Sequence, residues 1–152
     1  MKSSLLILRQ VDRKIQRFPA INEVFIPKDG WIKLIRTTLN MSLRQLAERL
    51  SVSPQNIRKL ELSEKEGSIS LKSLRETAQA LNMQLVYGFV PKDGSLEAMV
   101  ESKARKLATS IVMRTSNSMK LEDQENTPSR IKESIEELTQ EIKKEMSKKL
   151  WD

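Results

Sequence analysis

The stretch "SLRQLAERLSVSPQNIRKLELSE", residues 42–64, decides the fold. Its apolar residues recur at spacings of three and four, which is typical of helices that bury one face. They are Leu43, Leu46, Ala47 and Leu50 in the first half, and Ile57 and Leu60 in the second. Ser42 and Ser53 each stand where a helix N-cap is expected, and Pro54 follows at a position that needs no N–H donor. The stretch therefore predicts two short helices joined by a tight turn.

The second of these helices, residues 53–62, carries polar side chains at its start. In a helix-turn-helix, the second helix enters the DNA major groove by its N-terminal end. Glutamine and asparagine amides can bond to adenine and lysine can bond to guanine, so Gln55, Asn56 and Lys59 are predicted to read bases. The other predicted DNA-binding residues are Ser42, Arg44 and Ser53, which are placed for backbone contacts, and Arg58. The alternative interpretation is that the amides only cap and solvate a surface helix.

Further elements surround this pair of helices. Apolar periodicity predicts helices over residues 31–39 and 71–81, the second with Ser70 as its N-cap. Residues 4–18 predict a basic amphipathic helix that ends at a proline. The stretch "MQLVYGFV", residues 83–90, predicts a strand because it is enriched in β-branched and aromatic residues.

Two short stretches are nearly identical: "FIPKDG" at residues 25–30 and "FVPKDG" at residues 89–94. Each predicts an extended segment that stops at proline, followed by an Asp-Gly turn into a helix. Asp29 is the expected cap of the first of these helices. The two extended pieces could pair as a small ribbon, whose register the sequence does not give.

The C-terminal part is predicted to form helices in two stretches. An apolar stripe begins after Ser95 and ends at Val112, and the stretch at residues 114–129 interrupts the pattern. A last helix opens at Pro128, and its apolar residues are Ile131, Ile135, Leu138, Ile142 and Met146. This stripe must bury against the chain itself, a second copy or another protein.

The composition of the 152 residues excludes several classes of function. Cysteine and histidine are absent, so the commonest metal ligands and the commonest general base are missing. With four glycines there is no glycine-rich phosphate loop, and we expect no enzyme, no metal and no cofactor. No apolar run approaches the ~20 residues of a membrane span, and the lack of cysteine suits a reducing compartment. A cytoplasmic protein without membrane contact is expected.

The charge is distributed unevenly. The net charge of +7 lies entirely within residues 1–94, whereas residues 95–152 carry equal numbers of acidic and basic residues. A basic surface in the first part suits a polyanion such as DNA. The alternative interpretation is that this charge only keeps the protein soluble.

The segments "SLRQLAERLSVSPQNIRKLE" and "SLKSLRETAQALN" resemble the Xre family, the Cro and phage-repressor type of helix-turn-helix domain. The resemblance covers about residues 31–82. It implies base-reading positions at Gln55, Asn56 and Lys59 and core positions at Ile57 and Leu60. Leu43 departs from the family, which often has glutamine there as a phosphate contact.

Longer segments are similar to the group called mobile mystery protein A: "DGWIKLIRTTLNMSLRQLAERLSVS", "GSISLKSLRETAQALNMQLVYGFVPKDGSLEAMV" and "SMKLEDQ". In that group the neighbouring gene encodes mobile mystery protein B, which contains a Fic domain. Fic enzymes transfer AMP from ATP to hydroxyls of target proteins. The resemblance implies an antitoxin that binds its own operator and restrains a Fic-domain toxin encoded next to it.

The stretch "SMKLED", residues 118–123, is similar to the inhibitory pattern of Fic antitoxins, a Ser or Thr followed four residues on by Glu and then by Gly or Asn. Ser118 and Glu122 match this pattern, and Asp123 departs from it. The resemblance implies that Glu122 pairs with an arginine that would otherwise bind the ATP γ-phosphate. The alternative is a local helix cap, with Ser118 at the start of a turn and Glu122 close behind it.

The sequence thus predicts a mostly α protein with a short β segment. A basic N-terminal helix, residues 1–24, is expected over an Xre-type helix-turn-helix domain, residues 25–91, and a helical extension, residues 92–152, is expected to contact a second copy or the toxin. The expected function is a homodimeric repressor that binds a double-stranded DNA operator and acts as an antitoxin. One alternative is an interaction protein whose main role is toxin neutralisation, with weak or secondary DNA binding. The other is an assembly scaffold. The operator sequence, the dimer surface and the target of the toxin stay open.

Overall fold

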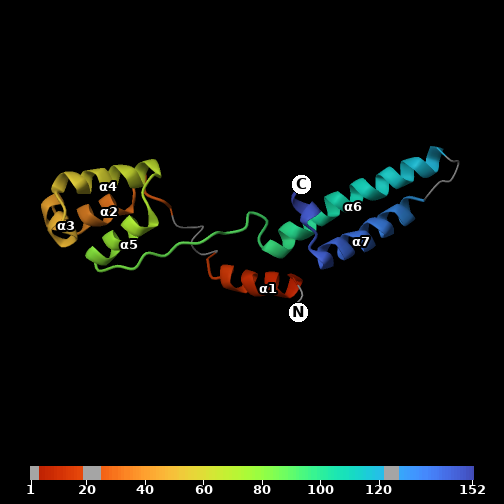
Figure 1. Ribbon diagram of the computed structural model, residues 1–152, viewed down its shortest axis with the longest axis horizontal. Helices are drawn as coiled ribbons and strands as arrows, with labels where there is room; N and C mark the ends of the chain where they lie inside the picture. Colours follow the sequence, from red (N-terminus) through yellow and green to blue (C-terminus); the bar gives the residue numbers. More distant parts are fainter. Residues whose placement is uncertain (1–3, 19–24, 122–126) are drawn as a thin grey trace. The chain divides into compact units, whose positions relative to one another are not determined.

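The computed structural model describes residues 4–18, 25–121 and 127–152, which form helices joined by turns and extended segments (Figure 1). The elements are α1 (Ser4–Ile15), α2 (Trp31–Thr38), α3 (Leu43–Leu50), α4 (Pro54–Glu66), α5 (Leu71–Ala80), α6 (Leu96–Leu121), α7 (Pro128–Glu145) and the 3₁₀ helix η2 (Lys148–Trp151). Across the described ranges, every helix is either too short or too polar to span a bilayer. The predicted mostly α fold is confirmed.

The chain folds as two compact units. One is Glu23–Tyr87, which contains α2 to α5 and is called the four-helix unit below. The other combines Met1–Asn22 with Gly88–Asp152, contains α1, α6, α7 and η2, and is called the hairpin unit. The four-helix unit is therefore inserted, along the chain, between two helices of the hairpin unit.

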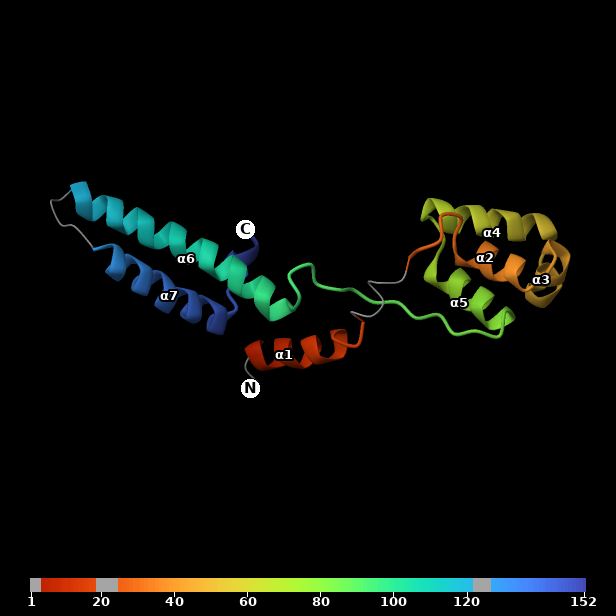
Figure 2. The same ribbon diagram turned by 180° about the vertical axis from the view of Figure 1, so that it is seen from behind.

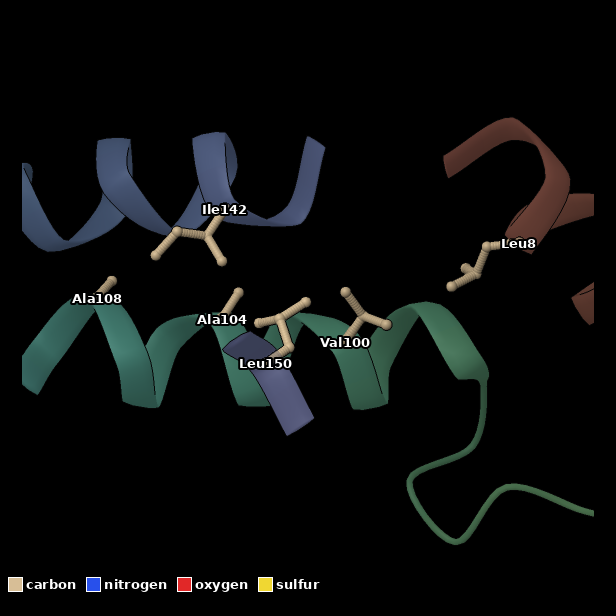
Figure 3. Packing of buried hydrophobic residues seen from close by; sticks show 6 residues of the cluster. All are labelled: Leu8, Val100, Ala104, Ala108, Ile142 and Leu150. Atoms are coloured by element: carbon tan, nitrogen blue, oxygen red, sulfur yellow. The ribbon is translucent and has the colours of Figure 1, made fainter. Parts of the chain in front are cut away.

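In the hairpin unit, α6 and α7 lie side by side as an antiparallel pair (Figures 1 and 2). The buried core residues come from every element of the unit (Figure 3): Leu8, Val100, Ala104, Ala108, Ile142 and Leu150. The two alanines are completely buried, so the small side chains of α6 lie where other elements pack closely against it. Ile135 and Leu138 of α7, and Met146 directly after it, pack against the same core. The apolar stripe of the last helix therefore buries against its own chain.

Polar contacts join α1 to the start of α6. The Asp12 carboxylate accepts hydrogen bonds from the backbone N–H groups of Leu96 (2.7 Å) and Glu97 (3.0 Å). Arg9 donates to both carboxylate oxygens of Glu97, at 3.1 and 2.9 Å. Lys143 of α7 lies 2.9 Å from the same carboxylate. A negative group at a helix N-terminus is favourable because the first N–H groups lack partners within the helix.

The expected placement of residues 1–24 over the helix-turn-helix domain stays a prediction. The structure packs α1 against α6 and α7, through Leu8 and the buried carboxylate of Asp12. On α1 the apolar Val11 is exposed, whereas the neighbouring Asp12 is buried. An aspartate that caps a helix more than eighty residues away in the sequence leaves no local pattern to find.

In the four-helix unit, α2 to α5 pack around Ile32, Leu46, Ala47, Ile57 and Leu81. The predicted N-caps are confirmed: the side chains of Ser42, Ser53 and Ser70 accept hydrogen bonds from the backbone N–H groups three residues ahead. Ser42 forms a full capping box with Gln45. A buried ion pair joins Arg36 of α2 to Glu61 of α4, with Arg36 Nε 2.5 Å from Glu61 Oε1. The guanidinium also donates to the Met41 carbonyl at 3.0 Å, so the buried charges are paired and hydrogen-bonded.

The two Pro-Lys-Asp-Gly stretches form the same turn, as expected. The N–H of Gly30 donates to the Pro27 carbonyl (3.1 Å), and the N–H of Gly94 donates to the Pro91 carbonyl (3.3 Å). Both glycines have φ near +90°, a region that glycine adopts without strain, and each turn leads into a helix. The expected cap at Asp29 is wrong, because Gly30 is the N-cap of α2 and has no side chain.

The cap of α2 comes instead from another helix. Glu64 Oε1 of α4 accepts a hydrogen bond from the Ile32 N–H at 2.8 Å. A Cβ atom at Gly30 would collide with this carboxylate, so glycine serves both the positive φ and the space that the cap needs. Asp29 pairs with Lys65 at 3.1 Å, and the hydrogen bond from Lys65 is the main reason that the pKa of Asp29 is lowered.

The predicted strand over residues 83–90 is wrong, since the described ranges contain no strand. Residues 83–90, which follow α5, have no regular secondary structure. Residues 25–27, which precede α2, have none either. The residue types favour a strand, but a strand needs a partner for its backbone groups. Phe25 and Phe89 are each more than four-fifths exposed.

The network at Glu97 predicts a pH dependence. Hydrogen bonds from Arg9 and then Lys143 lower the pKa of Glu97 from an ordinary value of 4.5 to about 2. The fold therefore favours the ionised carboxylate, and this stabilisation is complete above pH 4.5 and is lost as the pH falls toward 2. We expect the thermal unfolding temperature of the wild type to fall more steeply over this range than that of Glu97→Gln, measured by circular dichroism. Glu133→Gln, an exposed change on α7, should keep the wild-type slope. Equal slopes for all three proteins would show that Glu97 contributes nothing.

Candidate nucleic-acid interface

The centre of the candidate interface is the connection between α3 and α4. Helix α3 ends at Ser51, which adopts a left-handed conformation with φ of 55°, and the Val52 N–H donates to the Ala47 carbonyl at 2.9 Å. Ser53 then caps α4, so the turn between the helices takes only residues 51–53. Because Ala47 is 1% exposed and small, the two helices can approach closely at this point. A short turn between two packed helices is the helix-turn-helix arrangement.

Helix α4 turns one face inward and the opposite face outward. Ile57 is fully buried, at 0% exposure. With about 100° per residue, positions two before and two after Ile57 lie on the far side of the helix. These positions hold Gln55 and Lys59, which are exposed and separated by one helical turn. The structure thus places both residues together on the outward face near the N-terminal end of α4.

Asn56 and Arg58 flank this outward face on opposite sides. Asn56 lines a groove of about 310 Å³ between α4 and α5, together with Lys59, Ser63, Ser73 and Glu76. Arg58 lines a groove of about 380 Å³ bordered by α2, α3 and α4. Asn56 is only about 100° around the helix from the buried Ile57, so of the three expected base readers it is placed least directly on the outward face.

The three residues expected to contact the DNA backbone lie at helix starts. The hydroxyls of Ser42 and Ser53 accept hydrogen bonds from the N–H groups of Gln45 (3.1 Å) and Asn56 (3.2 Å). Each hydroxyl hydrogen stays available, so a capping serine can also donate to a phosphate oxygen. Arg44 is exposed and lies 3.6 Å from Glu48 one turn along α3. An exposed pair of this kind is weak, so it leaves the guanidinium available to DNA.

Two cations that the sequence reasoning missed share the groove of Arg58. Lys33 of α2 and Lys65 of α4 line it, and Lys65 is paired there with Asp29. The rest of the lining is Leu43, Leu62 and the ion-paired Arg36 and Glu61. Lys65 follows Arg58 by seven residues, so helical spacing was a signal that could have found it. Lys33 is brought there only by the packing of α2 on α4. Leu43 occupies the position of the expected phosphate contact and lies in a groove that also holds an exposed apolar side chain, that of Leu62.

Part of the basic charge expected to face DNA is used elsewhere. Arg9 pairs with Glu97, and this contact raises the pKa of Arg9 through hydrogen bonding and charge attraction. Arg13, Lys14 and Arg17 are exposed but belong to the hairpin unit. Part of the positive charge of residues 1–94 therefore lies on the hairpin unit and not on the four-helix unit.

Comparison with known proteins agrees with this geometry. Residues 32–87 match the family model described as Helix-turn-helix, and this range contains nearly all of α2 and the whole of α3, α4 and α5. No curated protein and no solved structure matches the chain significantly. The chain thus contains an Xre-type helix-turn-helix domain, whose class is that of sequence-specific DNA-binding regulators.

Substitutions on the outward face of α4 test the assignment of Gln55 and Lys59. Each change to alanine should cost about 1–3 kcal/mol on the preferred site and relax base preference at one position, because a base-edge hydrogen bond is lost. Fluorescence anisotropy with the preferred site and with single-base variants measures this. Lys72→Ala removes an exposed cation on α5 and should leave base preference unchanged. An equal loss on preferred and random DNA would contradict the assignment of base contacts.

Proposed function

We propose that the protein is a transcriptional repressor that binds the operator of its own operon as a homodimer. The observation that carries the proposal is the outward face of α4, where Gln55 and Lys59 lie opposite the buried Ile57 within the matched domain. Amide and ammonium groups at this place fit the edges of adenine and guanine in the major groove. The inward face of the same helix is held by the buried Ile57 and the ion pair of Glu61 with Arg36, and these contacts fix the orientation of the helix.

A homodimer follows from the size of the interface. One recognition helix reads only a few base pairs, which is too few for an operator to stand out among competing sites. Two copies related by a two-fold axis read two half-sites about 34–36 Å apart on one face of DNA. The proposed operator is therefore a pseudo-palindrome.

DNA titration at several salt concentrations tests the proposal. The DNA upstream of the gene should bind at least ~10³-fold more tightly than a shuffled sequence, and affinity should fall steeply with salt because phosphate contacts release counterions. An electrophoretic mobility shift assay with both DNAs measures this. A protein that serves only as a scaffold shows no sequence-dependent complex. Weak binding without preference, beside tight toxin binding, would instead favour an interaction protein whose main role is toxin neutralisation.

The same protein is proposed to act as the antitoxin of a Fic-domain AMP transferase encoded next to it. The resemblance to mobile mystery protein A supports this partner, and so does the match of Ser118 and Glu122 to the inhibitory pattern. Ser118 lies exposed in the last turn of α6 and its hydroxyl donates to the Arg114 carbonyl at 3.2 Å. The expected interruption of the helix before Ser118 and its role as a starting cap are therefore wrong. Glu122 lies outside the described residues.

The chemistry of the inhibition is competition for one arginine. A carboxylate from Glu122 that occupies a Fic arginine prevents a bidentate contact between that arginine and the ATP γ-phosphate. Glu122→Ala should restore AMP transfer by the Fic enzyme while the complex still forms. AMP transfer from radiolabelled ATP and co-purification measure the two properties. Glu133→Ala, the same change at an exposed position of α7, should leave the inhibition intact. Full inhibition by Glu122→Ala would assign the restraint to another surface.

A further inference from the structure

The segment Met83–Tyr87 leaves α5 as an extended chain, and most of its backbone groups form no hydrogen bond with the described residues. Asn82 ends the helix in a left-handed conformation, with φ of 56°, and the Met83 N–H donates to the Ala78 carbonyl at 2.7 Å. Beyond that contact, the backbone groups of Gln84–Tyr87 form no hydrogen bond within the part of the chain that the structure describes. Free N–H and C=O groups on an extended segment are a template for strand pairing.

The side chains of this segment are unusually apolar for an exposed stretch. Val86 is 63% exposed, Tyr87 59% and Met83 45%, whereas Leu85 is half-buried. Residue types of this kind are enriched in strands, where they pack against neighbours on both sides. The segment is therefore exposed along its edge and on part of its surface, although its composition suits a paired strand.

One side of the segment lies on the four-helix unit. Met83, Leu85 and Val86 line an apolar groove of about 340 Å³ between α2 and α5. The other lining residues include Trp31, Ile35, Leu74, Ala78 and Leu81. Trp31 remains 42% exposed at this groove, so the groove is not closed by its own chain. The contact with this groove fixes where the segment lies and leaves an apolar surface beside it.

We propose that Met83–Tyr87 pairs with the same segment of a second copy as an antiparallel two-stranded ribbon, which forms the dimer contact. The inference rests on the proposed homodimer that reads a two-fold operator. A ribbon centred on Leu85 is symmetric: Leu85 lies opposite Leu85 of the second copy, and Gln84 lies opposite Val86 of the second copy. Met83 then lies opposite Tyr87 of the second copy. Pairing satisfies the backbone groups of alternate residues and brings the opposite copy beside both apolar grooves.

The sequence offers one other candidate strand, and it is a poor partner. Phe25 and Ile26 are extended and strongly exposed, but Pro27 follows directly and has no N–H to donate. A ladder with this piece ends after two described residues, whereas the symmetric ribbon uses five residues from each copy. The identical copy is also the partner that a two-fold DNA reader requires.

Charge pairs on the exposed residues of the ribbon test both the partner and the register. In Gln84→Glu/Val86→Glu, each glutamate faces a glutamate of the second copy, so the dimer should weaken by about tenfold. In Gln84→Lys/Val86→Glu, each lysine faces a glutamate, so the dimer should recover to near the wild-type affinity. Sedimentation at several protein concentrations measures the dimer, and circular dichroism checks that both variants are folded. A wild type that stays monomeric, or two variants that dimerise equally, would overturn the ribbon.

A cysteine cross-link gives an independent readout, since the chain contains no cysteine. In Leu85→Cys the two introduced thiols lie opposite each other, close enough for a disulfide after mild oxidation. Ser102→Cys, at an exposed position of α6, should stay uncross-linked at the same concentration. Absence of a covalent Leu85→Cys dimer in a protein that sediments as a dimer would place the contact elsewhere. Specific DNA binding by such a protein would leave the repressor proposal standing while the ribbon fails.

Discussion

Two helix N-termini in this protein are satisfied by carboxylates that come from other helices, and both units depend on that constraint. Gly30, the N-cap of α2, supplies no side-chain cap, and the Ser95 hydroxyl before α6 accepts the Ala98 N–H at 3.0 Å rather than those of Leu96 and Glu97. Glu64 of α4 therefore accepts the hydrogen bond of the Ile32 N–H, and Asp12 of α1 accepts those of Leu96 and Glu97. Each cap joins elements that are far apart along the chain. The Asp12 cap holds α1 on α6, although the four-helix unit separates these two helices in the sequence.

Helix α4 can present polar side chains outward because other residues of the helix make its structural contacts. Its inward contacts are made by the buried Ile57, the ion pair of Glu61 with Arg36 and the cap that Glu64 provides. A lone buried carboxylate would be strongly unfavourable, but Glu61 is paired and Glu64 is hydrogen-bonded. Gln55 and Lys59 therefore carry no structural duty that the structure records, and they are available to DNA.

The exposed apolar surface of the chain lies largely outside the two hydrophobic cores. Phe25 and Ile26 at the start of the four-helix unit, and Val86 and Tyr87 at its end, are among the most exposed large apolar residues. Apolar side chains gathered at such places favour an interaction surface over a structural role within one chain. A regulator that works as a pair on DNA needs such a surface, and its position beside α2 and α5 leaves the outward face of α4 free.

The sequence by itself determined the local features. Three local features depend only on neighbours within four residues, so the sequence is enough to predict them. They are the serine caps, the spacing of three and four between buried positions in α3 and α4, and the repeated Pro-Lys-Asp-Gly turn. For the same reason the sequence alone predicts that Gln55 and Lys59 lie on the outward face.

Only the tertiary structure decided the features that rest on distant partners. The position of α1 follows from Asp12 and Leu8 meeting α6, the cap of α2 follows from Glu64, and Lys33 joins the groove of Arg58 through helix packing. Residues 83–90 have the composition of a strand but no partner among the described residues, and composition cannot supply the second set of backbone groups that a ladder requires. A local sequence pattern predicts the conformation of its own segment. Burial, capping by a distant residue and strand pairing each depend on contacts between two segments.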